Sequence, residues 1–318
     1  ELLEMRLQGL LAAPGGAVDA LEHRPLLISP PVRARHAQEP EMAEFDPEHW
    51  ILKKAEFTKP YSMCVAQFLR SRSGLSRAHA ACKVATLGDE SAVGILERGV
   101  REDSFWGAAA EAAKALGSIR TQGAFLALKR LLKVPHPKVR RAVVEALAHF
   151  PMSETASILK PVSVKDPSLN VQAEALQVLG TLKDSRWIPY LAKALKRSSY
   201  WDLLACGALK GLANTQHPKA LPFLRQASKA PMSYPARSVS IRALGRLASI
   251  SPDTVDLLAI TLESDDDRIL LITIQTLAIL RDVRAIAPLK KLKARHPDSR
   301  IKVSVTEALA RITGEAID

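Results

Sequence analysis

The sequence has few cysteines and few aromatic residues. Its 318 residues include 3 Cys, and aromatic side chains make up 5% of the chain. The cysteines are scattered and form no Cys-x-x-Cys pair. This pattern excludes a disulfide framework and a zinc knuckle, and it favours a reducing, cytoplasmic compartment. Glycine is sparse at 15 residues and proline is moderate at 20, which argues against large disordered regions.

Long apolar runs are also missing. The best candidate for a membrane span, residues 269–280, is interrupted by Thr273, Gln275 and Thr276, so no membrane span is expected. The apolar patch at residues 7–13 lacks the basic and long hydrophobic regions of a signal peptide. The chain begins at Glu1, which indicates a fragment or a processed chain.

Catalytic motifs are absent as well. A zinc peptidase needs His-Glu-x-x-His, but no histidine here is followed by Glu, and none has a second His four residues later. There is no Gly-x-Ser-x-Gly elbow and no glycine loop for phosphate. We read Asp265–Asp267 as a helix cap and not as a cation site, and Cys82 and Cys206 as core residues. No catalytic, metal-binding or cofactor-binding residue is therefore assigned, and no cofactor is expected in this chain.

The chain does contain a repeat. Ala/Leu-rich stretches end on a similar signature eight times, at intervals of 29 to 35 residues. The eight anchors are Leu87, Leu116, Leu147, Leu179, Leu212, Leu247, Leu277 and Leu309. A period near 30 with this composition predicts an all-α fold, a right-handed superhelical stack of about eight helix pairs.

Each anchor closes a second helix, B, that follows a first helix, A. The apolar spacing predicts A helices over 60–71, 90–101, 121–133, 153–163, 185–197, 217–229, 253–263 and 283–295. It predicts B helices over 75–87, 104–117, 137–149, 168–181, 200–213, 235–249, 266–280 and 299–312. Asp89, Asp184 and Asp282 stand where an N-cap is needed. Each pair exposes apolar surface that only a neighbouring pair can cover.

The residues before the repeats differ in charge and pattern. Residues 1–50 hold 4 Lys and Arg against 9 Asp and Glu, a net charge of −5, whereas residues 51–318 carry +17. Short apolar runs at 2–11 and 26–28 suggest strands, although the first could be a short helix. We therefore predict an N-terminal leader over 1–58, partly β or irregular, and a helical repeat domain over 59–318.

Three phrases resemble HEAT-like repeats. Residues 182–191 and 280–289 look like the first helix of such a repeat, and residues 136–147 look like the second. The resemblance covers roughly 85% of the chain. It implies a stacked helical fold, but it leaves the function open because such arrays serve many functions.

A narrower resemblance concerns residues 45–57 and 103–107. The phrase Phe-Asp-Pro-Glu-His-Trp-Ile-Leu-Lys-Lys is similar to the C-terminal part of zinc aminopeptidases of the aminopeptidase N family, where it leaves a β-sandwich and enters a HEAT-like domain. The residues that match the signature are Asp46, Pro47, Trp50, Leu52, Lys53, Phe105, Trp106 and Gly107. The resemblance implies a parent enzyme whose zinc site lies upstream of Glu1, and it makes the leader a remnant of the sandwich.

Basic residues at or near the B helices form a candidate binding surface for phosphates or acidic side chains, with a solvated outer face as the alternative reading. They are Lys83, Arg140, Arg141, Arg237, Arg242, Arg268, Arg300 and Lys302. The aromatics Trp106, Trp187, Tyr200 and Trp201 could stack on bases if exposed, but filling gaps between repeats is the expectation for them.

Three functions follow from these features. The preferred one is a non-catalytic interaction domain of an aminopeptidase-related protein, which walls a peptide cavity or binds a protein or peptide partner on its concave face. The basic charge favours the second, a solenoid that binds nucleic acid as HEAT-like DNA glycosylases do. The third, a bilin lyase-type HEAT protein, is supported only by the generic repeat pattern. The sequence does not give the oligomeric state.

Overall fold

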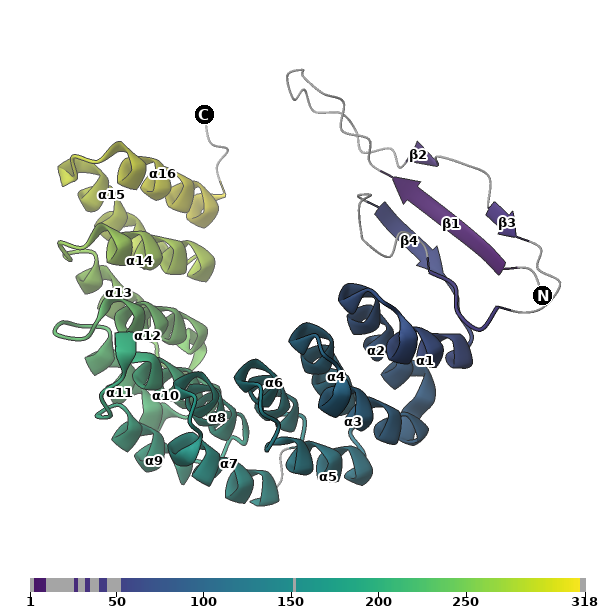
Figure 1. Ribbon diagram of the computed structural model, residues 1–318. Coiled ribbons are helices and arrows are strands. Elements are labelled where there is room, and N and C mark those ends of the chain that lie inside the picture. The colour runs from purple at the N-terminus through teal and green to yellow at the C-terminus, as the bar shows by residue number, and fades with distance from the viewer. Residues whose placement is uncertain are drawn as a thin grey trace. The chain divides into compact units, whose positions relative to one another are not determined.

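The computed structural model describes residues 3–9, 26–27, 32–34, 40–44, 53–150 and 153–314 (Figure 1). It divides into two compact units, Glu1–Ala146 and Leu147–Asp318. Strands occur in the leader only, and the described residues from Tyr61 onward are helical or lie in short connections. Two helices of unit 1 form the first pair of the array, α1 (Tyr61–Arg70) and α2 (Gly74–Gly88).

The leader contributes a small antiparallel sheet to unit 1. The central strand β1 (Leu3–Gly9) pairs along one edge with β2 (Leu26–Leu27) and β3 (Val32–Ala34), and along the other with β4 (Lys53–Phe57). The first apolar run is therefore a strand, not a helix. The predicted domain boundary at residue 58 falls between β4 and α1, and it stays a prediction.

The remaining helices continue the alternation of A and B. The A helices are α3 (Ala92–Glu102), α5 (Gln122–Leu131), α7 (Ser153–Lys165), α9 (Trp187–Ala194), α11 (Leu221–Ala227), α13 (Thr254–Thr261) and α15 (Ile286–Arg295). The B helices are α4 (Trp106–Ile119), α6 (Pro137–Leu147), α8 (Leu169–Thr181), α10 (Leu203–Asn214), α12 (Tyr234–Arg246), α14 (Asp267–Leu280) and α16 (Ser299–Thr313). Over the described residues, the prediction of eight helix pairs is confirmed.

Capping residues set where the helices begin. Ser73 accepts a hydrogen bond from the backbone N–H of Ser76 at the start of α2, and Thr121 does the same for Ala124 at the start of α5. The predicted cap Asp282 accepts from the N–H of Arg284, and Asp266 from that of Arg268. These side chains satisfy amides that the first turn of a helix leaves unbonded, and α2, α5 and α14 begin within one residue of their predicted starts.

Small residues hold the B helices together. In unit 2, α8 packs on α10, α10 on α12, α12 on α14 and α14 on α16. A Cβ added at Gly180 would lie 1.9 Å from the carbonyl oxygen of Gly211, and one at Gly207 would lie 2.4 Å from that of Ala173. The backbones of α8 and α10 therefore touch, which any larger side chain at these positions would prevent.

Larger apolar side chains fill the space between the A and B layers. Towards the end of unit 2 they form one core that includes Leu258, Leu270, Leu277, Leu289 and Val305, all nearly inaccessible to solvent. In this part of unit 2 each pair helps to cover the next, as the stacking model requires. Cys82 is an exception to the predicted core because it is exposed on α2.

The close contact of α8 and α10 predicts that Gly180→Ala destabilises the chain, although alanine is the better helix former. Overpacking costs about 1–3 kcal/mol, which outweighs a gain of about 1 kcal/mol in helix propensity. Gly94→Ala is the matched control, because a Cβ at that helical glycine meets nothing within 4 Å. We expect urea unfolding to show a lower midpoint for Gly180→Ala and a higher one for Gly94→Ala. A higher midpoint for both would contradict the backbone contact.

Candidate functional site

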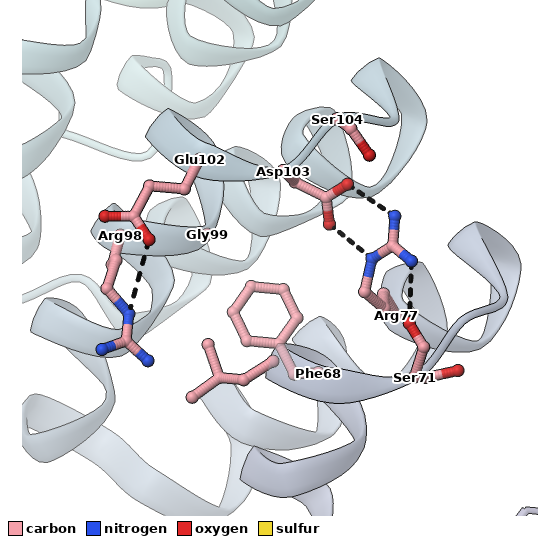
Figure 2. A pocket seen from close by; sticks show the side chains of 9 residues that line it. Phe68, Ser71, Arg77, Arg98, Gly99, Glu102, Asp103 and Ser104 are labelled. Carbon is pink, nitrogen blue, oxygen red and sulfur yellow. Dashed lines mark hydrogen bonds and ion pairs between the residues drawn. The ribbon is translucent and has the colours of Figure 1, made fainter.

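A buried ion pair shapes the turn between α3 and α4. The Arg77 guanidinium on α2 donates two hydrogen bonds of 2.7 Å to the Asp103 carboxylate, and a third of 2.8 Å to the carbonyl of Ser71 (Figure 2). The Arg77 and Asp103 side chains are 13% and 5% exposed. The hydrogen bond to Asp103 raises the pKa of Arg77, so the guanidinium stays charged. The pair ties α2 to the turn that begins α4.

Asp103 also orients the residues that follow it. Its carboxylate accepts a hydrogen bond of 2.8 Å from the backbone N–H of Phe105, one residue before α4 begins. The Phe105 ring lies against Gly74 and Gly107, where an added Cβ would come within 2.4 Å and 2.6 Å of ring atoms. Only glycine leaves room for the ring at these two positions, so the glycines and the ion pair together fix the Phe105 side chain.

A cavity lies beside this ion pair. It measures about 270 Å³, and Figure 2 shows Phe68, Arg98 and Glu102 around it in addition to the pair. Arg98 and Glu102 are 3.9 Å apart and mostly exposed. Arg77 and Arg98 therefore each already face a carboxylate. The arrangement serves the packing of α1, α2 and α3, and we do not assign the cavity as a ligand site.

The groove that we assign as the candidate functional site lies on the B helices of unit 1. Its volume is about 370 Å³. Its walls come from α2, α4 and α6, and its floor includes the small residues Ala78, Gly107, Ala110 and Ala142. The remaining lining residues are Leu75, Phe105, Trp106, Glu111, Lys114, Lys138, Arg141 and Glu145. Small residues on the floor and large ones at the rim make this surface concave.

Trp106 is the main apolar side chain of the groove. It is 40% exposed, and its ring stacks on His136 with 5.8 Å between the ring centroids and 6° between the ring planes. The Lys138 ammonium lies 4.0 Å from the centroid of the indole ring, in the geometry of a cation–π contact. Leu75, another lining residue, is exposed as well. The indole is thus held in place while much of its surface stays accessible.

The groove carries charges of both signs. Lys114 and Glu111 form an ion pair of 2.9 Å on α4, and this hydrogen bond raises the pKa of Lys114. Arg141 and Glu145, one turn apart on α6, are both exposed and line the groove. A ligand that crosses the groove therefore meets an apolar ring together with carboxylates and cations.

The predicted basic surface is only partly realised in unit 1. Lys83 is exposed on α2, and Arg141 lines the groove. Arg140 is buried, and its guanidinium donates to the carbonyls of Val134 at 3.0 Å and Pro135 at 2.6 Å. Its inclusion was wrong, because the helical spacing places this side chain under the loop before α6 and not on the surface.

In unit 2 the candidate arginines are held by neighbours. The guanidinium of Arg268 donates two hydrogen bonds to Asp266, and that of Arg300 donates three to Asp298. Arg237 donates to the carbonyl of Ser228 and to the Ser264 hydroxyl. Lys302 is half-buried, whereas Arg242 is exposed on α12. Much of the predicted positive charge is therefore balanced locally.

The aspartate–arginine unit recurs four times in unit 2 and is called the clasp below. Its members are Asp184–Arg186, Asp266–Arg268, Asp282–Arg284 and Asp298–Arg300. In each clasp the aspartate accepts a hydrogen bond from the backbone N–H of the arginine and pairs with its guanidinium. Hydrogen bonds from the arginine lower the pKa of all four carboxyls, that of Asp298 to about 2. The Asp-x-Arg spacing is visible in the sequence and could have identified these pairs.

No group of three or more His, Cys, Asp and Glu side chains among the described residues could hold a metal ion. Burial raises the pKa of the Cys64 and Cys206 thiols, which makes them poorer nucleophiles at neutral pH. No described helix is long and apolar enough to cross a membrane.

Known proteins agree with this architecture. A model of HEAT repeats matches in four overlapping segments, 64–148, 97–168, 126–206 and 156–245, which together cover more than half of the chain. The chain belongs to the HEAT-repeat family. The predicted resemblance to HEAT-like repeats is confirmed, and a search of the curated proteins found no match.

Solved structures show similar helical arrays. A karyopherin bound to the extreme C-terminus of a protein phosphatase is 15% identical with a TM-score of 0.50, and the match covers 80% of this chain and 33% of the karyopherin. Human deoxyhypusine hydroxylase is 20% identical over 80% of this chain and 96% of its own, with a TM-score of 0.37. The CpcE–CpcF complex of phycocyanin lyase from Nostoc sp. is 18% identical over 92% and 100%, with a TM-score of 0.38. The karyopherin likeness shows the HEAT-repeat fold alone.

The signature residues divide into two groups. Asp46, Pro47, Trp50 and Leu52 lie outside the described residues, and Lys53 begins β4. Phe105, Trp106 and Gly107 lie at the start of α4, where the HEAT-repeat chain uses them to build the groove. The sequence singled out these three residues through a resemblance. It missed Arg77, Gly74 and Lys138, whose contacts depend on neighbouring helices.

The buried Arg77–Asp103 pair predicts a large effect of Asp103→Asn. The change leaves the Arg77 charge buried without its counter-ion, which costs about 3–5 kcal/mol. The adjacent, exposed Glu102 is the matched control, and Glu102→Gln is expected to cost less than about 1 kcal/mol. Urea unfolding of both variants measures the difference. Equal stabilities would contradict the structural role of the pair.

The clasps predict that unit 2 loses stability in acid. Their carboxyls have lower pKa values in the folded chain than the value of about 3.9 in the unfolded chain. The stabilising contribution of Asp298 is therefore complete above about pH 4 and is lost as the pH falls towards about 2, and the other three carboxyls act in the same direction. We expect Asp298→Asn to lower the urea midpoint near neutral pH and to reduce its drop in acid. Asp265→Asn, at an exposed carboxylate outside the clasps, should change neither quantity.

Proposed function

We propose that this HEAT-repeat chain is a non-catalytic interaction domain that binds an extended peptide segment in the groove of α2, α4 and α6. The observation that carries the proposal is the partly exposed Trp106 ring, held by His136 and Lys138 on a floor of small residues. Aromatic side chains held rigid in a hollow contribute strongly to binding because they lose little conformational entropy.

The lining of the groove defines the kind of peptide. Leu75, Phe105 and Trp106 offer apolar contact for one aliphatic or aromatic side chain. Glu111 and Glu145 can pair with a cation of the peptide, and Lys138 and Arg141 with a carboxylate. The volume of about 370 Å³ suits a few side chains of an extended segment and is too small for a whole amphipathic helix. We therefore propose a segment with one apolar anchor and polar flanks of both signs.

The parent protein is the finer part of the proposal. The Asp-Pro-x-x-Trp phrase at residues 46–50 and the Phe105–Gly107 turn support a zinc aminopeptidase-related protein of the cytoplasm. Within such a protein the domain would wall the peptide cavity or bind partners, and the zinc would be held elsewhere. A His-Glu-x-x-His motif in the coding sequence upstream of Glu1 is the expected finding. A start codon directly before Glu1 would rule this parent out.

Nucleic-acid binding is the second candidate, and the charge of +17 over residues 51–318 favours it. The clasps oppose it, because four arginines already face carboxylates. A salt titration separates the two functions, since phosphate contacts make log K fall steeply with log salt. Duplex or single-stranded DNA that binds with such a slope would support the second candidate over the first.

The groove predicts that Trp106→Ala weakens peptide binding by about tenfold or more, as expected for a central aromatic anchor. Peptides selected from a random library on the unaltered chain provide the probe, and fluorescence polarisation measures their affinity. Leu126→Ala is the matched control, because Leu126 on α5 is also 40% exposed but lies outside the groove. It should leave the affinity within about twofold.

Two results would contradict this proposal. One is a selection on the unaltered chain that yields no binding peptide. The other is a selected peptide whose affinity survives Trp106→Ala while circular dichroism shows that the variant is folded. Both results concern the groove in unit 1 only, and they leave the question of the parent protein to the upstream coding sequence.

A further inference from the structure

Acidic residues are almost missing from one part of unit 2. Between Ser185 and Pro252 the sequence contains one acidic residue, Asp202, and eleven Lys and Arg, a net charge of +10. This stretch comprises α9 to α12, which are two consecutive helix pairs. Much of the positive charge of the repeat domain is therefore concentrated there. A basic residue on a merely solvated outer face would not require carboxylates to be so rare around it.

Two neighbouring aromatic residues project from the same stretch. Tyr200 is 79% exposed and Trp201 is 59% exposed, in the connection between α9 and α10. Their rings lie 6.1 Å apart and are tilted by 54°. The expectation that these aromatics fill gaps between repeats was wrong, since neither ring is buried. Large exposed aromatics are uncommon on surfaces that contact water only, and they are typical of binding anchors.

The backbone under these rings is unusual. Trp201 and Asp202 both have left-handed φ angles, 51° and 54°, which side chains other than glycine rarely adopt. Three hydrogen bonds hold the turn. The Asp202 N–H donates to the Ser199 carbonyl, the Leu204 N–H donates to the Ser199 hydroxyl at 3.0 Å, and the Ser233 N–H donates to the Asp202 carboxylate at 3.4 Å. These hydrogen bonds offset the cost of the left-handed conformation and hold the two rings in one fixed arrangement.

The cations of the stretch fall into two classes. Five of its arginines donate to groups of the chain itself: Arg186, Arg197, Arg225, Arg237 and Arg246. The lysines Lys193, Lys196, Lys210, Lys219 and Lys229 are exposed, and no ion pair is found for them among the described residues. The lysines are thus available to an outside partner, whereas five of the six arginines already donate to groups of the chain.

We propose that Tyr200 and Trp201 form a docking knuckle for an acidic protein segment. In this arrangement the two rings enter an apolar hollow or hold an apolar side chain of the partner. Carboxylates beside that contact face Lys196, four residues before Tyr200, and Lys229, four residues before the Ser233 whose N–H donates to Asp202. Charge complementarity decides the sign of the partner, because the one acidic residue of the stretch, Asp202, already accepts a hydrogen bond from the Ser233 N–H. The proposal concerns unit 2 and does not depend on the groove of unit 1.

The geometry favours a protein over a single-stranded nucleic acid. Successive bases of one strand stack in parallel, and rings tilted by 54° are less suited than parallel rings to hold two such bases. Arginine is also the residue that grips phosphate with two parallel bonds, and five of the arginines in the stretch are occupied. Lysines on a flexible stem suit a carboxylate-rich protein surface.

The test uses the 318-residue chain and two synthetic peptides. Both have a Leu-Pro-Phe centre, which is flanked by glutamates in one and by lysines in the other. Fluorescence polarisation should show binding of the glutamate peptide, weakened by salt, and no binding of the lysine peptide. Trp201→Asn should weaken the affinity for the glutamate peptide by about tenfold or more, since asparagine tolerates the left-handed backbone but lacks the ring. Trp201→Phe should retain most of the affinity.

Matched variants separate the knuckle from general effects. Ile260→Gln changes an equally prominent apolar side chain, 66% exposed on α13, and should leave the affinity unchanged. The double variant Lys196→Glu, Lys229→Glu should weaken binding of the glutamate peptide, and Lys290→Glu, on α15 outside the stretch, should have little effect.

Three outcomes would overturn the proposal. The first is that the glutamate peptide does not bind the unaltered chain, or binds Trp201→Asn equally well. The second is that an oligothymidine strand binds more tightly than the glutamate peptide and requires Trp201. The third is that vesicles of phosphatidylserine bind more tightly than the glutamate peptide and require Trp201, which would make the knuckle a membrane contact. Trp106→Ala should not alter binding at the knuckle. A failure of the knuckle proposal can therefore be distinguished from a failure of the groove proposal.

Discussion

The structure depends on the close approach of neighbouring B helices. Alanine and glycine at the contact positions let the backbones of α8 and α10 meet, with a distance at Gly180 that excludes even a methyl group. The helices of one pair cannot bury their apolar faces alone, so this contact decides whether the next pair can stack. The Leu and Val side chains of the core then fill the space that the backbone contact defines. The low aromatic content follows from the same constraint, since large rings would separate the layers.

Polar side chains fix the turns between the helices. In unit 2 three of the four clasps have two roles, because Asp266, Asp282 and Asp298 each cap a helix and also hold the arginine two residues later. In unit 1 the buried Arg77–Asp103 pair has a comparable role, and it also sets the position of Phe105 and the start of α4. These pairs use charges that composition alone would count as free. The net charge of a helical array therefore overstates the charge that a partner meets.

The two proposed binding surfaces differ in physical character. The groove of unit 1 is concave and mixed in charge, and its aromatic ring is supported by His136 and Lys138. The knuckle of unit 2 is a projection within a stretch of almost purely basic charge, and a left-handed backbone holds its rings outward. The first is suited to receive a side chain, and the second to enter a partner or to hold one of its side chains. Both are consistent with a chain that binds proteins.

The sequence by itself determined the repeat, the order of the helices and most of their ends. These features depend on spacing along one chain, and the caps Asp266 and Asp282 act within two residues of their position. Only the tertiary structure decided which charged and aromatic residues are available. Arg140 turned out to be buried, and Tyr200 and Trp201 are exposed, because burial depends on how the helices and their connections pack. The groove likewise needed three helices from three repeats, whose side chains meet only when the repeats stack.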